Sequence, residues 1–244
     1  MHILITRPEG DALPLKSRLE QLGCRVTLAP LIGVVPNVIP FSALDGATAL
    51  VATSRNALKA LAASPALQRA KSLPLYVVGP GTAATAREIG FSQITEGTGT
   101  AAGLVLVLKA RAQGETFVHL GGDVLAFDLE TALASQGVNV RRLTAYQSVP
   151  AETLAPGVIA ALRDRDISAV VLMSPRTAEI WARLAGRSAS PADLAEVAHL
   201  CLSGAVAEAL RESEVEGKIM IAARPNLEEM LALVKRLAAQ SKAE

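Results

Sequence analysis

Arginines stand directly after several apolar runs of this 244-residue sequence, at the points where the runs end. They are Arg7, Arg55, Arg176 and Arg224. A guanidinium group binds carboxylates and phosphates through paired, charge-assisted hydrogen bonds. The net charge is only +1, which excludes a diffuse attraction to nucleic acid or to an anionic membrane. The sequence therefore predicts that anions are bound locally, at strand ends.

Hydroxyl side chains occupy the same turns as these arginines. They are Thr6, Thr53, Ser54, Thr82, Ser174 and Ser203. Such residues bind a ligand carboxylate, or they cap the following helix, which stabilises it by about 1 kcal/mol each. Both roles stay open for each residue.

The turn that begins Gly79-Pro80-Gly81-Thr82 formally matches G-x-G-x-x-[GA] between a strand and a helix, and Glu96 follows the next short strand. This pattern is the outline of a dinucleotide-binding site. The turn does not follow the leading strand, however, and the helix after it is short. We keep dinucleotide binding through the Gly79–Gly81 turn as a weaker alternative.

Tyr146 is one of only two tyrosines. It lies in a segment expected to connect two domains, where its phenol can reach a ligand or pack the hinge. None of the three histidines is paired in sequence with a second metal ligand; His119, near a predicted strand end, is the one that can face a ligand. No metal site is predicted, and a Ser-His-Asp hydrolase is poorly supported because G-x-S-x-G is absent.

The sequence favours a cytoplasmic protein. Cys24 and Cys201 lie in apolar contexts without metal-type spacing, as expected of buried thiols in a reducing compartment. The longest apolar stretch, residues 101–108, falls far short of the about 20 residues of a membrane helix. The N-terminus enters an apolar run directly, which indicates a first strand and not a signal peptide.

Short apolar runs alternate with alanine-rich helical patterns along the chain. Strands are expected at residues 3–6, 26–29, 49–53, 75–78, 93–95, 117–120, 138–143, 169–173, 199–202 and 218–222. Helical patterns include residues 13–22, 56–63, 82–89 and 227–237. Strands that are apolar on both faces are typical of parallel sheets covered by helices on two sides, so the fold class is α/β.

An internal repeat divides the sequence into two similar halves. Residues 3–36 align without gaps on residues 117–150, with Leu19 on Leu133 and Gly23 on Gly137. Residues 49–61 resemble 169–184, and residues 101–108 resemble 227–234. Two similar sheets are therefore expected.

The folded domains need not coincide with these halves. Residues 31–40 and 144–150 are β-compatible and contain proline, which an exposed two-stranded ladder tolerates. If they pair, residues 1–32 and 151–244 form one discontinuous domain, residues 33–40 and 144–150 the connecting ladder, and residues 41–143 the second domain. Two sequential domains divided near residue 112 are the less favoured alternative.

Six segments in this order resemble the uroporphyrinogen-III synthase family. They are ILITRP, ALVATSRNAL, LYVVGPGTA, LTAYQSVP, VVLMSPRTA and ARPNLEEMLALV. No single motif is diagnostic, but the ordered set covers nearly the whole chain. The resemblance implies two α/β domains joined by a two-stranded ladder, with an active site in the cleft between them and no cofactor.

The resemblance also implies an activity: a cyclising hydro-lyase that converts hydroxymethylbilane into uroporphyrinogen III, with inversion of ring D and loss of water. It implies that Tyr146 assists departure of the ring A hydroxyl and that Thr82 points its amide and hydroxyl at substrate carboxylates. From the residues themselves, we expect the strand-end groups to bind these carboxylates. These groups are Arg7, Thr53, Ser54, Arg55, Gly79, Thr82, Ser174, Arg176 and Ser203. A monomer in transient contact with hydroxymethylbilane synthase is expected.

Two departures from the family pattern leave an alternative open. The second-half turn, Ser203 to Ala207, lacks two hydroxyl residues that are common in the family, and an arginine common there is missing from residues 120–123. A protein of this fold that binds a tetrapyrrole or another anion without converting it is the alternative.

Overall fold

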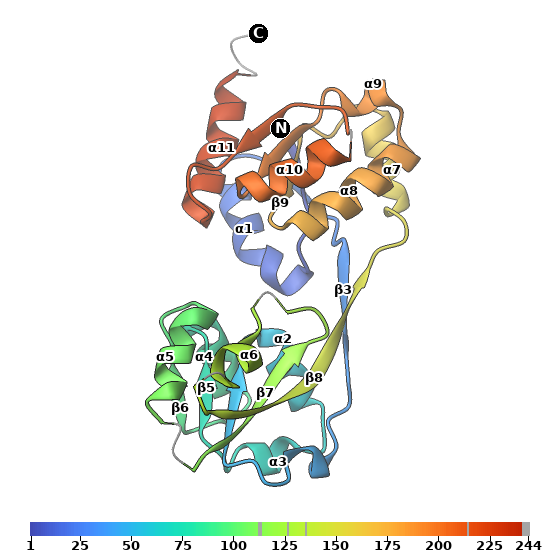
Figure 1. The fold of residues 1–244 in the computed structure, drawn as a ribbon. Coiled ribbons are helices and arrows are strands. Elements are labelled where there is room, and N and C mark those ends of the chain that lie inside the picture. Colours follow the sequence, from blue (N-terminus) through green and yellow to red (C-terminus); the bar gives the residue numbers. More distant parts are fainter. Residues whose placement is uncertain (112–113, 126, 135, 214, 241–244) are drawn as a thin grey trace. The chain divides into compact units, whose positions relative to one another are not determined.

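The computed structural model describes residues 1–111, 114–125, 127–134, 136–213 and 215–240. The chain divides into two compact units, which we call unit 1 (Met1–Gly33 and Val149–Glu244) and unit 2 (Val34–Ser148). Unit 1 is therefore discontinuous in sequence, whereas unit 2 is a single segment. Figure 1 shows the elements of both units.

Unit 1 is built on a parallel five-stranded sheet with the order β11-β10-β9-β1-β2. Its strands are β1 (His2–Ile5), β2 (Arg25–Leu28), β9 (Ala169–Leu172), β10 (Ala198–Cys201) and β11 (Ile219–Ile221). Every residue of β1, β9 and β10 is buried. A strand covered on both faces must be apolar throughout, and this is why these strands show no polar alternation.

Two helical layers cover the sheet of unit 1. Helices α1 (Glu9–Gln21) and α11 (Leu227–Gln240) pack on the face that carries Ile3, Ile5 and Leu200. Helices α7 (Pro156–Arg163), α8 (Pro175–Ser188), α9 (Pro191–Leu194) and α10 (Gly204–Glu212) pack on the face that carries Leu4 and Leu172. The predicted sheet with helices on both faces is confirmed.

Unit 2 repeats this architecture on a six-stranded sheet with the order β3-β8-β7-β4-β5-β6. Its strands are β3 (Ile32–Pro36), β4 (Ala49–Ala52), β5 (Leu75–Val77), β6 (Ile94–Glu96), β7 (Thr116–Gly122) and β8 (Asn139–Pro150). The pairs from β8 through β6 are parallel. The central strands are therefore β7 and β4, whose carboxyl ends lie side by side.

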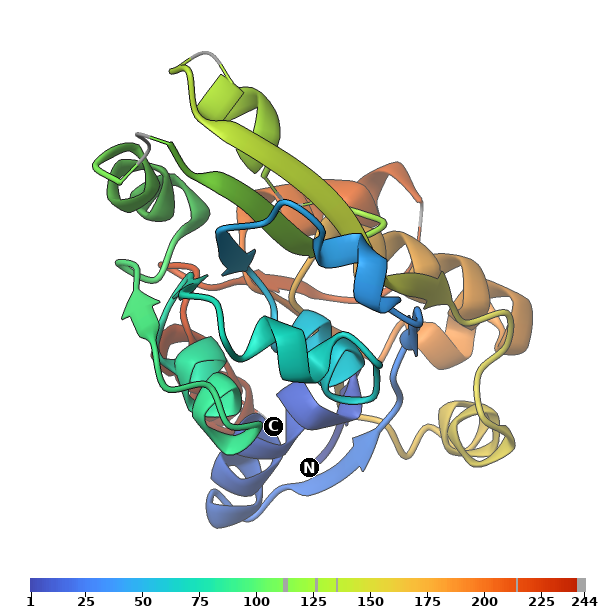
Figure 2. The ribbon, with the colours of Figure 1, turned by 90° about the horizontal axis from the view of Figure 1, so that it is seen from below.

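Helices also cover both faces of the unit 2 sheet (Figure 2). Helices α2 (Arg55–Ala62), α3 (Leu67–Ala70) and α4 (Pro80–Glu88), with a 3₁₀ turn at Phe41–Leu44, lie on the face of Leu50 and Leu120. Helices α5 (Ala101–Lys109) and α6 (Leu129–Ala134) lie on the face of Val51 and Phe117.

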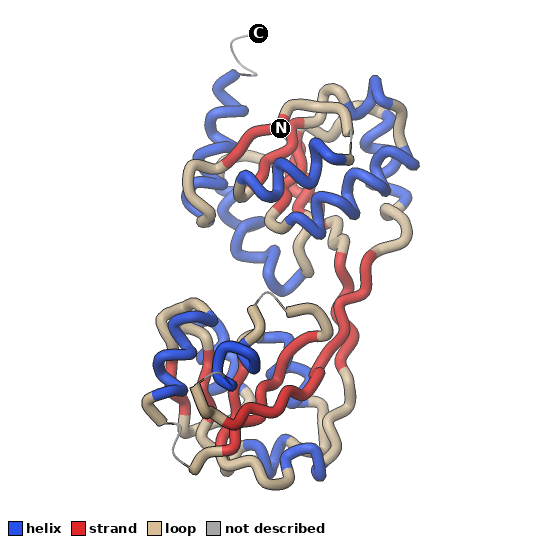
Figure 3. The backbone as a smooth tube through the Cα atoms, in the orientation of Figure 1, coloured by secondary structure: helices blue, strands red, loops and turns tan. Residues whose placement is uncertain are grey.

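Strand β3 pairs with the far end of β8, and Figure 3 shows the two strands side by side. The amide of Asn37 donates to the carbonyl of Ala145 (2.8 Å), and the amide of Ala151 donates to the carbonyl of Leu31 (2.9 Å). The residue numbers rise on one strand as they fall on the other, so the pair is antiparallel. The chain passes from unit 1 into unit 2 within β3 and returns within β8.

The strand orders account for the internal repeat. Reading β2-β1-β9-β10-β11 against β8-β7-β4-β5-β6 pairs β1 with β7 and β9 with β4, which are the segments that align in sequence. Each unit thus combines the first two strands of one repeat with the last three of the other. The prediction of two similar sheets is confirmed.

The described part of the chain contains no helix long and apolar enough to cross a membrane. Its cysteines, Cys24 and Cys201, are both free and buried. Burial raises the pKa of the Cys201 thiol to about 12, so this side chain is an unreactive part of the core.

Candidate functional site

Unit 2 has a pocket at the carboxyl ends of β4, β5 and β7, with a volume of about 350 Å³. This edge is where open α/β sheets bind their ligands. Three predicted site residues line it: Thr53, Ser54 and Tyr146. The remaining lining residues are Val78, Gly99, Ala101, Gly122, Val124, Leu125 and Phe127.

The two hydroxyl residues after β4 have different partners. Ser54 is the N-cap of α2, and its side chain accepts a hydrogen bond from the amide of Asn56 (3.1 Å). The Thr53 hydroxyl lies 3.1 Å from Nε2 of His119 on the adjacent strand β7. The Ser54 side-chain oxygen therefore caps helix α2. The Thr53 oxygen instead forms a hydrogen bond with the His119 imidazole.

Tyr146 lies against the backbone of Gly122, its register partner on β7. A β-carbon built on Gly122 would come within 2.7 Å of Cζ and 2.9 Å of the hydroxyl oxygen of Tyr146. Only glycine leaves room for the ring at this place. The phenol is half-buried and borders the pocket, so Tyr146 is within reach of a ligand there.

Arg142 fixes the turn that follows Gly122. Its Nη2 donates to the carbonyls of Gly122 (2.7 Å) and Asp123 (2.9 Å). The Asp123 carboxylate accepts a hydrogen bond from the amide of Ser148 (2.8 Å). Strand β8 thus holds the β7 end of the pocket through both a cation and a backbone donor.

His119 is buried below the pocket, with 1% of its surface exposed. Burial, and secondly the nearby Arg142 cation, lower the pKa of His119 to about 4. The imidazole is consequently neutral at pH 7 and carries a single N–H.

The other predicted site residues of unit 2 do not line this pocket. Gly79 is the N-cap of α4, and a β-carbon on it would lie 3.1 Å from Cα of Gly99, which does line the pocket. Thr82, in the first turn of α4, is 6% exposed. Arg55 is the first residue of α2 and is half-buried.

The alternative based on the Gly79–Gly81 turn depends on Glu96 as a ribose ligand. The Glu96 carboxylate instead accepts a hydrogen bond from Arg87 of α4. The next residue, Gly97, packs against the backbone at the carboxyl end of β5. A β-carbon on Gly97 would lie 3.1 Å from the Val78 carbonyl oxygen. These contacts account for Glu96 and Gly97 without a nucleotide.

Unit 1 has a corresponding pocket at the carboxyl ends of β1, β9 and β10, with a volume of about 270 Å³. It is lined by Arg7, Pro8, Ile32, Met173, Ser174, Thr177 and Leu202. Strand β1 is an interior strand, paired with β2 and β9, and Arg7 follows its carboxyl end. The Arg7 guanidinium contacts the sulfur of Met173 at 3.6 Å.

The serines at the starts of α8 and α10 differ in their capping role. Ser174 forms a capping box with Thr177: its side chain accepts from the Thr177 amide, and the Thr177 hydroxyl accepts from the Ser174 amide. Ser203 is the N-cap of α10 but makes no side-chain capping bond. Arg176 lies in the first turn of α8 and is half-buried.

Arg224, which the sequence places at a strand end, is paired with a carboxylate of its own unit. The Arg224 guanidinium donates twice to one carboxylate oxygen of Glu229, at 2.9 and 2.7 Å. Glu229 lies in the first turn of α11, so the helix that follows β11 supplies the counter-charge.

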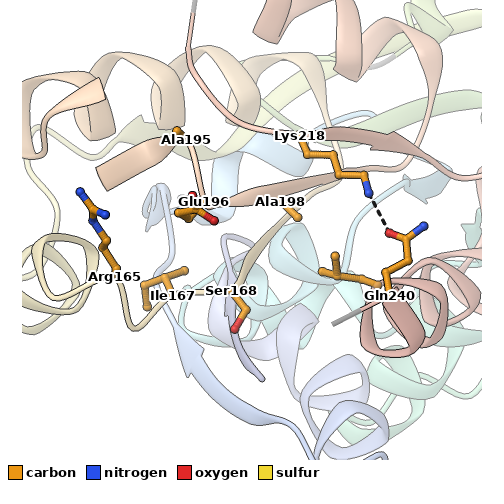
Figure 4. A pocket seen from close by; sticks show the side chains of 9 residues that line it. Arg165, Ile167, Ser168, Ala195, Glu196, Ala198, Lys218 and Gln240 are labelled. Atoms are coloured by element: carbon orange, nitrogen blue, oxygen red, sulfur yellow. Dashed lines mark hydrogen bonds between the residues drawn. The ribbon is translucent and has the colours of Figure 1, made fainter. Parts of the chain in front are cut away.

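Another pocket, of about 440 Å³, lies at the opposite edge of the unit 1 sheet (Figure 4). Its two cations have partners, since Arg165 pairs with Asp193 (3.5 Å) and Lys218 donates to Gln240 (2.7 Å). Glu196 adds a negative charge to the lining. This pocket lies at the amino ends of the strands, and its lining carries both charges. Neither property favours it as a binding site for a ligand with several carboxylates. Within the described ranges, no cluster of three or more His, Cys, Asp or Glu side chains could hold a metal ion.

Sequence reasoning did not identify the apolar wall of the unit 2 pocket. Val124 and Phe127 are exposed by 53% and 37%, and they follow β7 in an irregular segment. Large apolar side chains in such a segment are a usable signal, because they are costly to expose unless they contact a ligand or partner.

Fold and pockets together define a protein of two similar α/β units that present arginine, hydroxyl and phenol groups at the carboxyl ends of their strands. The family profile described as uroporphyrinogen-III synthase HemD matches residues 14–232. The chain therefore belongs to the uroporphyrinogen-III synthase family, whose members are cyclising lyases of porphyrin and haem biosynthesis acting on hydroxymethylbilane. The function is that of a uroporphyrinogen-III synthase.

Solved structures share the fold of this chain. The crystal structure of uroporphyrinogen-III synthetase from Helicobacter pylori has a TM-score of 0.68 at 18% identity, covering 97% of this chain and 99% of the other. A mutant uroporphyrinogen III synthase from Thermus thermophilus has a TM-score of 0.52 at 20% identity, covering 98% and 99%. Among curated protein sequences no match was found.

Proposed function

We propose that the strand-end groups of both units bind the carboxylates of one hydroxymethylbilane molecule and steer its closure to uroporphyrinogen III. The arrangement of Thr53, Ser54 and Tyr146 around one pocket supports this proposal. Arg7 and Ser174 line a pocket at the equivalent edge of the unit 1 sheet, which also supports it.

The chemistry requires control of shape more than a strong catalyst. Loss of the ring A hydroxyl as water leaves an azafulvene, and the substituted carbon of ring D attacks it to give a spiro intermediate. That intermediate fragments and recloses with ring D inverted. Without steering, the bilane closes at the unsubstituted carbon and gives isomer I. Holding the two ends of the chain in one geometry supplies the selectivity.

Tyr146 is the acid of this proposal. Its phenol donates a hydrogen bond to the departing ring A hydroxyl, which leaves as water once it has gained a proton. Arg7, Arg55 and Arg176 bind carboxylates, with Gly79, Thr82 and Ser203 offering helix N-terminal donors. No cofactor takes part. The protein acts as a cytoplasmic monomer and receives its substrate in transient contact with hydroxymethylbilane synthase.

An isomer assay tests the proposal. Freshly prepared hydroxymethylbilane is incubated with the protein, the products are oxidised, and isomers I and III are resolved chromatographically. We expect isomer III to dominate, against isomer I in the protein-free control. A product mixture equal to the control would reject the proposal, and tight binding without turnover would support the binding-protein alternative.

A further inference from the structure

The buried imidazole of His119 has one hydrogen-bond partner among the described residues. Its Nε2 lies 3.1 Å from the Thr53 hydroxyl oxygen, whereas its Nδ1 is buried and has no partner within the described ranges. The ring lies under Gly121, where a β-carbon would come within 3.3 Å of Cε1. With 1% of its surface exposed, the imidazole is enclosed by the protein.

This asymmetry selects one neutral tautomer. A proton on Nδ1 would be a buried donor without an acceptor, which costs about 1–3 kcal/mol. A proton on Nε2 is donated to the Thr53 oxygen, and only a lone pair is left on Nδ1. The hydrogen bond therefore runs from His119 to Thr53.

The direction of this bond determines what Thr53 can do. A hydroxyl has one proton to donate and two lone pairs to accept with. If the imidazole donates to the oxygen, the hydroxyl proton stays available for another acceptor. Thr53 borders the pocket that also contains Tyr146, so a ligand carboxylate in that pocket is such an acceptor.

We propose that His119 is a positioning residue that fixes the Thr53 hydroxyl as a hydrogen-bond donor to a carboxylate of the substrate. This inference rests on the proposed function and adds to it a residue that never touches the substrate. It also gives Thr53 one role, carboxylate donor, where the sequence left a helix cap as the alternative. His119 need not be protonated for this role, because the oriented Thr53 O–H group, and not a cation, binds the substrate carboxylate.

The tautomer can be measured without substrate. Nitrogen-15 chemical shifts of the imidazole distinguish an Nδ1 proton from an Nε2 proton, and the substrate-free wild-type protein at pH 7 is the sample. We expect the Nε2–H form. An Nδ1–H form or a charged imidazolium overturns the proposal whatever the isomer assay shows, so the two proposals can fail separately.

Steady-state kinetics with hydroxymethylbilane provide the second test. Thr53→Val removes the donor and should raise KM about tenfold, the effect expected for one hydrogen bond to a charged group, with kcat changed less than about twofold. Thr53→Ser retains the hydroxyl and should recover most of the affinity. Thr48→Val is the matched control, because its hydroxyl pairs with Glu115 at the other end of β4, and its KM should equal that of the wild type.

His119 is then tested through its coupling to Thr53. His119→Phe should raise KM as much as Thr53→Val, and the double variant should be no worse than either single one. His119→Gln, which retains an N–H near the Nε2 position, should recover part of the effect. An unchanged KM in Thr53→Val, or additive effects in the double variant, overturns the proposal. If His119→Phe does not fold, the tautomer and the Thr53 series decide.

Discussion

The phenol ring of Tyr146 fills the space into which a side chain on Gly122 would project. The nearest approach would be 2.7 Å, from a Gly122 β-carbon to Cζ of the ring. Gly122→Ala should therefore displace the ring, destabilise the protein by about 1–3 kcal/mol and lower kcat. Chemical unfolding and the isomer assay measure both effects.

Gly186→Ala is the control for that variant. Gly186 lies inside α8 with nothing within 4 Å of an added β-carbon. Alanine should stabilise the helix by about 0.5–1 kcal/mol without a kinetic effect. A Gly122→Ala variant that behaved in the same way would contradict the packing described for Tyr146.

Tyr146→Phe separates the acid from the packing role. The ring stays in place over Gly122, so the unfolding free energy should change little, while kcat should fall about 10²-fold or more if the phenol assists the leaving group. The rate of isomer III formation is the measurement. Unchanged kinetics would assign Tyr146 to packing alone.

Arg7→Ala should raise KM for hydroxymethylbilane about tenfold, because one charge-assisted contact to a carboxylate is lost. Arg18→Ala is the control: Arg18 lies on α1, paired with Glu228 at 3.2 Å in an exposed position. It should leave KM unchanged and alter stability by less than about 1 kcal/mol. Equal KM values for the two variants would count against the assigned role of Arg7.

Ser174 and Ser203, the N-cap residues of α8 and α10, should respond differently to alanine. Ser174→Ala breaks a capping box and should cost about 1 kcal/mol of stability. Ser203 makes no capping bond, so Ser203→Ala should leave stability nearly unchanged and raise KM. Denaturant midpoints measure the stability of both variants, and steady-state kinetics measure their KM. If Ser203→Ala lost as much stability as Ser174→Ala, Ser203 would be a capping residue, contrary to this prediction.

His199 should make unit 1 sensitive to acid. It is fully buried against Trp181, its two ring nitrogens have no partner within the described ranges, and burial lowers its pKa to about 4. The unfolded chain binds a proton near pH 6.5, so the unfolded state gains protons first as the pH falls. Stability should decline between pH 6.5 and 4, with a loss from pH 7 to 5 of about 2 kcal/mol.

His199→Leu tests this acid sensitivity. The variant lacks the titrating group and should show a smaller decline in unfolding free energy from pH 7 to 5, whatever its stability at pH 7. His119 titrates over the same window for the same main reason, so part of the decline should remain. A decline as steep as that of the wild type would exclude His199 as its cause.

The strands could be predicted because strands buried on both faces consist almost entirely of apolar residues. Strand β9, Ala-Val-Val-Leu, is buried at every position. Ser174 is the N-cap of the following helix, so the strand must end before it. The internal repeat also predicted two similar sheets. The predicted domains, residues 1–32 with 151–244 and residues 41–143, stay a prediction, as do the roles of the individual site residues.

The misjudged parts of the site depend on contacts that periodicity does not encode. The sequence places Arg224 at a strand end, but the turn into α11 brings Glu229 back onto it. The apolar wall formed by Val124 and Phe127 lies in an irregular segment, where no repeating pattern marks it. His119 was recognised as near a strand end, yet its bond to Thr53 depends on the register between β7 and β4.

Unit 1 takes strands from both ends of the chain, and this affects the order of events during synthesis. Strands β1 and β2 are synthesised before unit 2, but β1 must wait for β9, more than 160 residues later, before its second edge is paired. Unit 2 is contiguous, so all its strands are available while β9, β10 and β11 are still to be translated. Unit 2 can therefore fold before unit 1, and β1 keeps one apolar edge unpaired until β9 has been made.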